Sequence, residues 1–267
     1  MKKIKRYLHL YKILISQFFK MIMQSKVDFL IGLLGFFFTQ FMGIAFLYLV
    51  FQQIPDLSGW TFEQLIFVYG FAQIPRGIDH LFTDNIWLVA WRLVITGDFD
   101  RFMLRPMNVF FQVISEKLQP DALGELLVGF SLVIISLVKG VAIIDAMHIC
   151  MFIISIFAGA VIYTSLKLIL ATIAFWIKRS GPFLQVAYEM SNFAKYPTEI
   201  YSKIVRFIIT WIIPFAFVAY IPARYFVIQN QSALFSIGIE VVIAIIFWIV
   251  AYSFFSYGIS KYESAGN

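Results

Sequence analysis

Long apolar runs separated by short polar segments extend over most of the chain. The clearest run is Phe29–Phe51, which carries no charge and is bounded by Asp28 on one side and by Pro55 and Asp56 on the other. A helix needs about 20 apolar residues to cross the hydrocarbon core of a bilayer. This run therefore predicts a membrane-spanning helix, and its repetition along the chain predicts an all-α membrane protein.

Five more runs bring the expected number of transmembrane helices to six. Four of them are well defined: one begins near Phe62 and continues to Phe82, and three others cover residues 123–138, 146–177 and 233–257. The remaining run lies between residues 179 and 233. At about 1.5 Å per residue, the run 146–177 is longer than the hydrocarbon core is thick. We expect its end to protrude into the cytoplasm near three basic residues, Lys167, Lys178 and Arg179.

The fifth span, between residues 179 and 233, has two interpretations. Hydropathy favours one straight span over 204–221. The competing interpretation starts a span at Pro182 and folds residues 197–227 as a re-entrant outer hairpin. It rests on three prolines that are poor partners for one straight helix, Pro197, Pro214 and Pro222. This hairpin places Lys203 and Arg206 outside, against the positive-inside rule, so the pattern leaves both interpretations open.

Composition supports the membrane assignment. Of the 267 residues 61% are hydrophobic and 13% are charged, whereas soluble domains average about 45–50% and about 25%. A single cysteine, Cys150, excludes a disulfide framework and a cysteine-rich metal site, and three scattered histidines disfavour a His-rich catalytic centre. Soluble enzymes are therefore excluded as a class, and no metal site is expected.

Motifs of the common energy-using and hydrolytic sites are missing from the sequence. It contains no Walker A pattern, Gly-rich phosphate loop, HExxH or GxSxG. We therefore expect no catalytic activity and no ATP site in this chain, which binds no cofactor of its own. Energy for transport would have to come from an ion gradient or from a partner protein.

The first 26 residues combine a basic and an apolar stripe. At 100° per residue one arc holds Ile4, Leu8, Tyr11, Ile15, Phe18 and Ile22, and a second holds Lys5, His9, Lys12, Ser16 and Lys20. This pattern favours a helix in the membrane interface with its basic face toward anionic headgroups, over a disordered basic tail. The positive-inside rule then predicts a multi-pass protein of the cell membrane with both termini cytoplasmic.

The basic residues of segment 84–117 place it in the cytoplasm as well. Its sequence WLVAWRLVITGDFDRFMLRPMNVF predicts an apolar helix, a break at Gly97 and Asp98, and a short amphipathic helix. In that helix Asp100 and Arg101 oppose four apolar side chains, Phe99, Phe102, Met103 and Leu104. Such a helix suits docking into a groove on another protein. Periodicity alone equally allows it to lie on lipid headgroups.

The string ITGDFDRFMLRPMN resembles the cytoplasmic loop of ABC-2 type permeases, in the branch with a pattern close to G-x-x-D-x-x-L-x-R-P. Gly97, Asp100, Arg105 and Pro106 match, and Met103 stands in place of Leu. Residues 175–226 are similar to the same branch, from the end of the fourth span through an outer hairpin. The likeness extends over essentially the whole chain, which implies one transmembrane domain over residues 1–267.

The resemblance implies the permease half of an ATP-binding cassette exporter. It implies a pair of permeases, often non-identical in this branch, on two ATPase subunits that hold ATP and Mg. The segment 1–26 would be the interfacial elbow helix, and the likeness favours 197–227 as the re-entrant hairpin. Coupling to the ATPase would fall to six loop residues, Gly97, Asp98, Asp100, Arg101, Arg105 and Pro106.

A translocation path between the two permeases would be lined by polar residues within apolar spans. The candidates are Gln40, Gln73, Arg76, Asp79, Gln185, Glu189 and Asn192. For each residue taken singly, interhelical hydrogen bonding, worth ~0.6 kcal/mol on average, is the preferred explanation. A path rich in Phe with few charges suits a hydrophobic or amphiphilic substrate such as a drug, a lipid-like molecule or a peptide. The expected partners are proteins and membrane lipid, with no nucleic acid.

An ion-coupled secondary transporter is the alternative function. Carboxylates within a membrane are costly and often functional, and the candidates are Asp79, Glu125, Glu189 and Glu240. Two observations weaken this alternative. Asp79 is spaced to pair with Arg76 three residues earlier, and the two halves of the chain show no internal repeat of the kind typical of such transporters.

Overall fold

The computed structural model describes residues 13, 16, 17, 20, 23, 24, 26–143, 145–228 and 232–264. This part of the chain is helical, with no strand among the described residues. The predicted all-α class is therefore confirmed for these residues. The expected interfacial helix over residues 1–26 lies almost entirely outside them.

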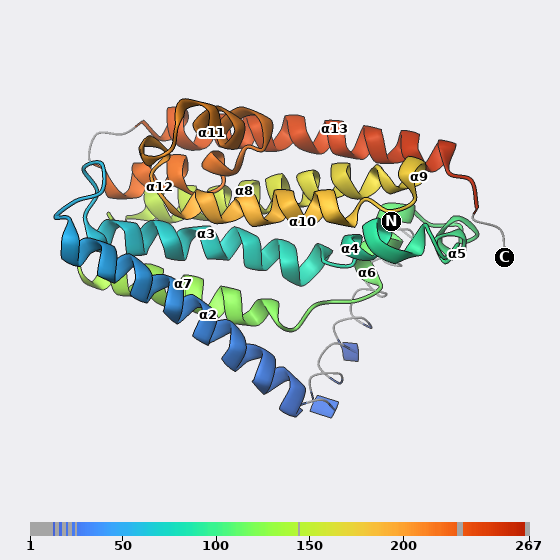
Figure 1. The fold of residues 1–267 in the computed structure, drawn as a ribbon, viewed down its shortest axis with the longest axis horizontal. Coiled ribbons are helices and arrows are strands. Elements are labelled where there is room, and N and C mark those ends of the chain that lie inside the picture. The colour runs from blue at the N-terminus through green and yellow to red at the C-terminus, as the bar shows by residue number, and fades with distance from the viewer. Residues whose placement is uncertain are drawn as a thin grey trace.

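Five long helices make up most of the bundle in Figure 1: α2 (Lys26–Gln53), α3 (Phe62–Thr83), α7 (Ala122–Val138), α8 (Ala146–Thr172) and α13 (Ile239–Lys261). Short helices at the end near the C-terminus are α4 (Ile86–Leu88), the π-helical η1 (Val89–Leu93), α5 (Asp100–Met103), α6 (Val109–Ser115) and α9 (Ala174–Ile177). The remaining helical segments are α10 (Gly181–Glu189), η2 (Met190–Lys195), η3 (Thr198–Ile200), α11 (Lys203–Phe207), η4 (Ile208–Ile212), η5 (Phe215–Phe217), α12 (Tyr220–Val227) and η6 (Leu234–Gly238). We call the end of the bundle that holds α5 the loop end, and the opposite end, toward which α11 and α12 lie, the hairpin end (Figure 1).

Three helices of the described chain are long and apolar enough to cross a membrane. They are Lys26–Gln53, Ala146–Ile177 and Phe235–Lys261, each close to a predicted run. A bent pair, Lys203–Ile212 with Phe215–Val227, is a fourth candidate, and α7 is shorter than these spans. The chain is thus a membrane-embedded helical protein, and its six-span topology stays a prediction.

The straight span over residues 204–221 is wrong. The helix formed by α11 and η4 ends at Ile212, and the pair is bent by 71°. Pro214 stands at this break and supplies no backbone N–H to continue a helix. Before it, α10 begins with Pro182 in its first turn, where proline is tolerated, and η2 prolongs it to Lys195. Both features agree with the competing interpretation, whose re-entrant course through a membrane stays a prediction.

Helix α3 is the central helix of the bundle, and glycines set how closely α7 approaches it. Every residue from Leu65 to Pro75 is buried. A Cβ atom added at Gly70 would lie 3.0 Å from the carbonyl oxygen of Gly129, and one added at Gly129 would lie 3.0 Å from the oxygen of Gly70. The two backbones therefore touch directly, as is common where membrane helices pack through small residues. By contrast, α2 diverges from the bundle in Figure 1, and most of its side chains are exposed.

We predict that Gly129→Val destabilises the bundle strongly. The added atoms meet the Gly70 backbone and come within 2.7 Å of the Ile74 side chain, and overpacking typically costs about 1–3 kcal/mol or more. Thermal unfolding of the detergent-solubilised chain measures the loss. Gly35→Val is the matched control, because no described atom lies within 4 Å of its Cβ position. Equal melting temperatures for the two variants would contradict the close α3–α7 packing.

Candidate functional site

A buried ion pair joins α3 to α8. Lys167 Nζ lies 2.8 Å from Asp79 Oδ2, and both side chains are 0% exposed. The other carboxylate oxygen accepts hydrogen bonds from the hydroxyls of Thr83, at 2.6 Å, and Thr164, at 2.8 Å. Tyr188 of α10 donates to Oδ2 at 3.3 Å. A buried charge is tolerated when it is paired and hydrogen-bonded, so this single carboxylate holds α3, α8 and α10 together.

A second group of charges joins α3 to α7 and η2. Glu125 Oε1 lies 3.5 Å from Arg76 Nε and 3.5 Å from His80 Nδ1. Arg76 also donates through Nη1 to Asn192 at 3.2 Å. On its other side, His80 Nε2 lies 3.8 Å from Asp84 Oδ2. The charged residues of α3 therefore reach partners on two neighbouring segments.

Residues of these two groups help to line a cavity of about 220 Å³, which we call the polar cavity. Its lining residues are Arg76, His80, Asp84, Trp87, Glu125, Gln185 and Tyr188. The ring of Tyr188 packs edge-on against Trp87 at 5.4 Å, and the Arg76 guanidinium lies 5.0 Å from the Tyr188 ring centre. Arg76 Nε and Glu125 Oε2 are buried without a hydrogen-bond partner among the described residues. The cavity thus offers charges of both signs and aromatic walls.

The structure brings five of the seven predicted path residues into this region. Arg76 and Gln185 line the polar cavity, and Asp79 accepts a hydrogen bond from Tyr188, which also lines it. Glu189 accepts from Gln185 at 2.9 Å and from Asn192 at 3.2 Å, and Asn192 in turn binds Arg76. The hydrogen bonds thus run from Gln185 through Glu189 and Asn192 to Arg76, that is, from α10 through η2 to α3. Their role as a substrate path stays a prediction.

Gln40 and Gln73, the other two predicted path residues, form a separate group with Tyr69. Gln73 Nε2 donates to Gln40 Oε1 at 2.6 Å, and Tyr69 donates to the same oxygen at 2.7 Å. Gln40 and Leu47 are the buried residues of α2. This polar contact therefore attaches an otherwise exposed helix to α3.

Two expectations about charges were wrong. Arg76 and Asp79 do not pair with each other, because Glu125 and Lys167 from other helices lie closer to their charged atoms. Lys167 does not protrude beyond the bundle, because it faces Asp79 in its interior. The sequence carried a signal for this residue: an ammonium group inside an apolar run needs a buried partner.

Glu240, the fourth candidate carboxylate, lies elsewhere, between α13 and α8. Its residue is 0% exposed, and it accepts a 2.5 Å hydrogen bond from Ser155. No cation of the described chain pairs with it. Asp79 and Glu125, in contrast, both face positive groups.

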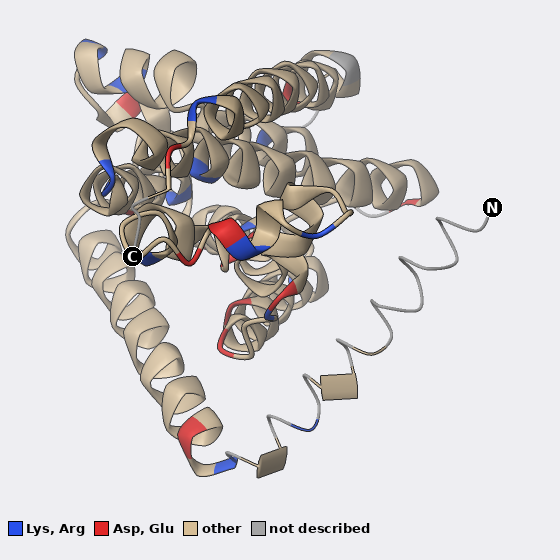
Figure 2. Cartoon of the chain, turned by 90° about the vertical axis from the view of Figure 1, so that its right-hand side faces the viewer, with Lys and Arg blue, Asp and Glu red and all other residues tan. Residues whose placement is uncertain are grey.

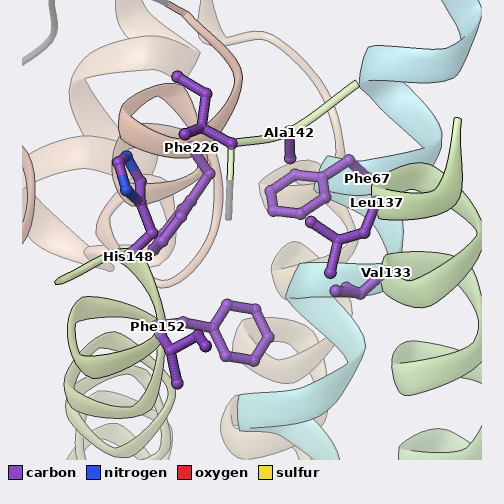
Figure 3. A pocket seen from close by; sticks show the side chains of 9 residues that line it. Phe67, Val133, Leu137, Ala142, His148, Phe152 and Phe226 are labelled. Carbon is purple, nitrogen blue, oxygen red and sulfur yellow. The ribbon is translucent and has the colours of Figure 1, made fainter. Parts of the chain in front are cut away.

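A second cavity, of about 200 Å³, is apolar (Figure 3). Figure 3 shows Phe67, Phe152 and Phe226 around it, with Val133 and Leu137 on one side. Residues from α3, α7, α8 and α12 line it, and His148 is its one polar side chain among those described. An apolar cavity of about 150 Å³ already holds a benzene-sized molecule, so this space can take an aromatic or branched apolar group.

The loop-end segment predicted as a docking helix is α5 with its flanks. Gly97 has a φ of +75°, a conformation that favours glycine and ends the preceding helix as predicted. The Asp98 carboxylate next to it accepts from Thr96 at 2.8 Å and lies 3.5 Å from Arg92. Figure 2, which faces this end, shows acidic and basic residues gathered here.

Phe99 and Phe102 are buried, so these two of the four apolar side chains predicted for docking are not exposed to a partner. Phe99 packs against Phe175 at 4.9 Å and against Tyr262 at 5.2 Å. An isolated single turn of helix is not stable by itself. The two ring contacts of Phe99 and the burial of both side chains therefore hold α5 against the bundle. The apolar side chains left to a partner are Met103, 44% exposed, and Leu104, 85% exposed.

Some charged residues of the motif are held by ion pairs or hydrogen bonds, and others are exposed. Arg101 pairs with Glu116 at 2.5 Å, and Asp100 accepts from Ser264 of the C-terminal segment at 2.5 Å. Burial, together with the Asp100 carboxylate, raises the pKa of Tyr262 in the same segment to about 12. Arg105 and Pro106 are exposed beside Leu104. The structure thus presents a short tip, Met103 to Pro106, on a packed base.

Comparison with known families identifies one match. Residues 34–266 match a family model described as ABC-2 family transporter protein. No curated protein matches the chain. The matched region includes the bundle from the middle of α2 onward, the polar cavity and α5.

We predict that Lys167→Met destabilises the chain by about 3–5 kcal/mol, the usual effect of removing one partner of a buried ion pair. The methionine keeps the apolar stem and leaves the Asp79 carboxylate buried without its cation. Lys167→Met combined with Asp79→Asn should recover much of the loss in a double-mutant cycle of unfolding measurements. Lys139→Met, at an exposed position, is the control. Additive effects of the two substitutions would contradict the coupling.

Proposed function

The chain belongs to the ABC-2 transporter family, and on this premise we propose that it is the permease subunit of an ATP-driven exporter. Family membership makes it a membrane component of transport, not itself catalytic, that works with an ABC ATPase. The proposal adds two ATPase subunits that hold ATP and Mg, a second and non-identical permease, and an outward direction of transport. The observation that carries it is the exposed tip of α5 on its buried base.

The buried base of α5, formed by Phe99 and Phe102, can transmit a displacement of the tip to the bundle. Phe99 and Phe102 belong to an apolar cluster that also contains Phe175, Leu184 and Phe255. These three residues lie in α9, α10 and α13. Because packed interiors are stiff, movement of α5 would shift the ends of these helices together. An ATPase that closes on ATP and presses on Leu104 would therefore act on the whole loop end.

The cargo would move at the interface with the second permease, past the polar residues of α3 and α10. The polar cavity offers charged and hydrogen-bonding groups, and the apolar cavity offers aromatic walls. A substrate with one polar and one apolar part matches this combination. We therefore propose a hydrophobic or amphiphilic substrate, with residues 197–227 as the re-entrant segment on the outer side.

An ion-coupled secondary transporter is the second candidate, and Glu240 is the observation that favours it. This carboxyl is buried with a serine as its hydrogen-bond partner in the described chain, which makes it able to carry a proton within the membrane. Transport that continues after ATP depletion and is abolished by Glu240→Gln or Glu189→Gln would support this candidate over the exporter.

We predict that Leu104→Asp releases the ATPase, because it places a charge where an exposed apolar side chain would enter the partner's groove. The tagged chain is purified from its native host, and the co-purified ATPase is quantified. Leu104→Met is the matched control and should retain it. Absence of any ATPase from the unmodified chain, or full retention by Leu104→Asp, would contradict the proposal.

Arg105→Ala is predicted to uncouple the complex without releasing it. Arg105 is exposed within the tip and is a motif residue, so its loss should leave the membrane fold and its melting temperature in place. ATP-dependent transport should fall by about tenfold or more, the effect expected when about 1.4 kcal/mol of coupling is lost. Unchanged transport in this variant would show that the motif does not couple the two proteins.

A further inference from the structure

We infer that the polar cavity binds the zwitterionic headgroup of an amphiphile. The anionic group of the ligand would face Arg76 and His80, and its cationic group would face Asp84 and Trp87. This inference rests on the proposed function, since it names the substrate class of the same permease. Its chemistry follows from how the lining side chains are placed and paired.

Arg76 and His80 form the side of the cavity that would take an anion. The Arg76 side chain is 20% exposed and that of His80 is 24% exposed, so both reach the cavity. Arg76 Nε is buried without a hydrogen-bond partner among the described residues, and its 3.5 Å approach to Glu125 is an ion pair without a hydrogen bond. Guanidinium donors bind phosphate and carboxylate groups strongly. An anionic oxygen in the cavity would therefore lie beside the exposed part of the Arg76 guanidinium.

Asp84 and Trp87 form the side that would take a cation. The Asp84 side chain is 25% exposed, and its cationic neighbours Lys167 and His80 lie 3.6 and 3.8 Å away, beyond a hydrogen bond. Trp87 lies three residues after Asp84 in the chain. Both residues also line an adjoining cavity of about 160 Å³. An aromatic face beside a carboxylate is the combination that recognises ammonium groups.

A ligand with a single charge fits this cavity poorly. A lone anion would approach Asp84 and Glu125, and a lone cation would approach Arg76, at a cost of like-charge repulsion in either case. A headgroup that carries both signs can place each charge next to its opposite. Electrostatic complementarity of this kind confers selectivity by rejecting the wrong ligand.

Size and surroundings indicate an amphiphile as the carrier of this headgroup. The polar cavity, about 220 Å³, has room for a headgroup and leaves an attached chain outside it. Exposed apolar side chains lie on the helices that bear the lining residues: Phe82 on α3, Leu88 on α4 and Val186 on α10. An alkyl chain can pack on these side chains and on the surrounding lipid. The apolar surface it covers adds to affinity.

Binding of three single-chain probes of equal chain length to the purified full-length chain tests the inference. The probes are a zwitterionic lysophosphatidylcholine, an anionic lysophosphatidylglycerol and a cationic alkyltrimethylammonium, and native mass spectrometry in a mild detergent measures their affinities. The zwitterionic probe should bind about tenfold more tightly than either singly charged probe, which corresponds to about 1.4 kcal/mol.

Variants separate the two sides of the cavity. Trp87→Leu and Arg76→Gln should each weaken binding of the zwitterionic probe by about tenfold. Arg76→Gln should also improve binding of the cationic probe. Trp211→Leu, on an exposed tryptophan of η4, and Glu63→Gln, on an exposed acid at the far end of α3, are the matched controls. Melting temperatures show which variants fold. Trp87→Leu changes no charge and provides the test if Arg76→Gln does not fold.

Equal affinity for the three probes, binding of none of them, or unchanged zwitterion binding in the folded variants would overturn the inference. These measurements need no ATPase. A chain that co-purifies with its ATPase yet shows no probe preference therefore refutes the headgroup site alone. A chain that shows the preference yet has no ATPase partner refutes the proposed exporter and keeps the headgroup site.

Discussion

The buried ion pair between Asp79 and Lys167 is the interaction on which the interior of the bundle depends. An ammonium group and a carboxylate that are both 0% exposed can persist only while they remain together, because an unpaired charge in this environment costs several kcal/mol. The pair therefore restrains the register of α3 against α8. Tyr188 adds α10 through its hydrogen bond to the same carboxylate.

Helix α3 makes different kinds of contact along its length. Its middle is packed on α7 through Gly70 and Gly129, where backbone contact leaves no space for side chains. Toward the loop end it carries Arg76, Asp79 and His80, whose partners come from α7, α8 and η2. A helix that is buried on most sides can carry charges only where its neighbours supply the opposite charge. The polar cavity arises at the place where those neighbours meet.

The polar cavity and the tip of α5 are connected by a short stretch of chain. Asp84 and Trp87 line the cavity, and Trp87 belongs to α4, which η1 follows at once. Both α4 and η1 contribute to the apolar cluster that holds Phe99 and Phe102. A change of position at α5 is therefore transmitted to the cavity wall through packed side chains and through the backbone. This connection gives a physical route between a partner protein at the loop end and a ligand inside the bundle.

Much of the fold follows from local features of the sequence. Apolar runs of sufficient length mark α2, α8 and α13, since the hydrophobic cost of exposing them to water depends on their composition alone. The break at Gly97 follows from a conformation that glycine adopts readily. The motif around Asp100 and Arg105 indicated the family, which the match over residues 34–266 confirms.

The partners of the charges required the folded structure. Asp79 and Lys167 are 88 residues apart, and Arg76 and Glu125 lie on different helices, so no periodicity along one helix connects them. Arg76 and Asp79 looked like a local pair because spacing along α3 was the relevant information in the sequence. The burial of Phe99 and Phe102 likewise depends on neighbours from distant segments. Hydropathy measures the environment a residue prefers, whereas a pairing is set by distances between helices that exist only after they pack.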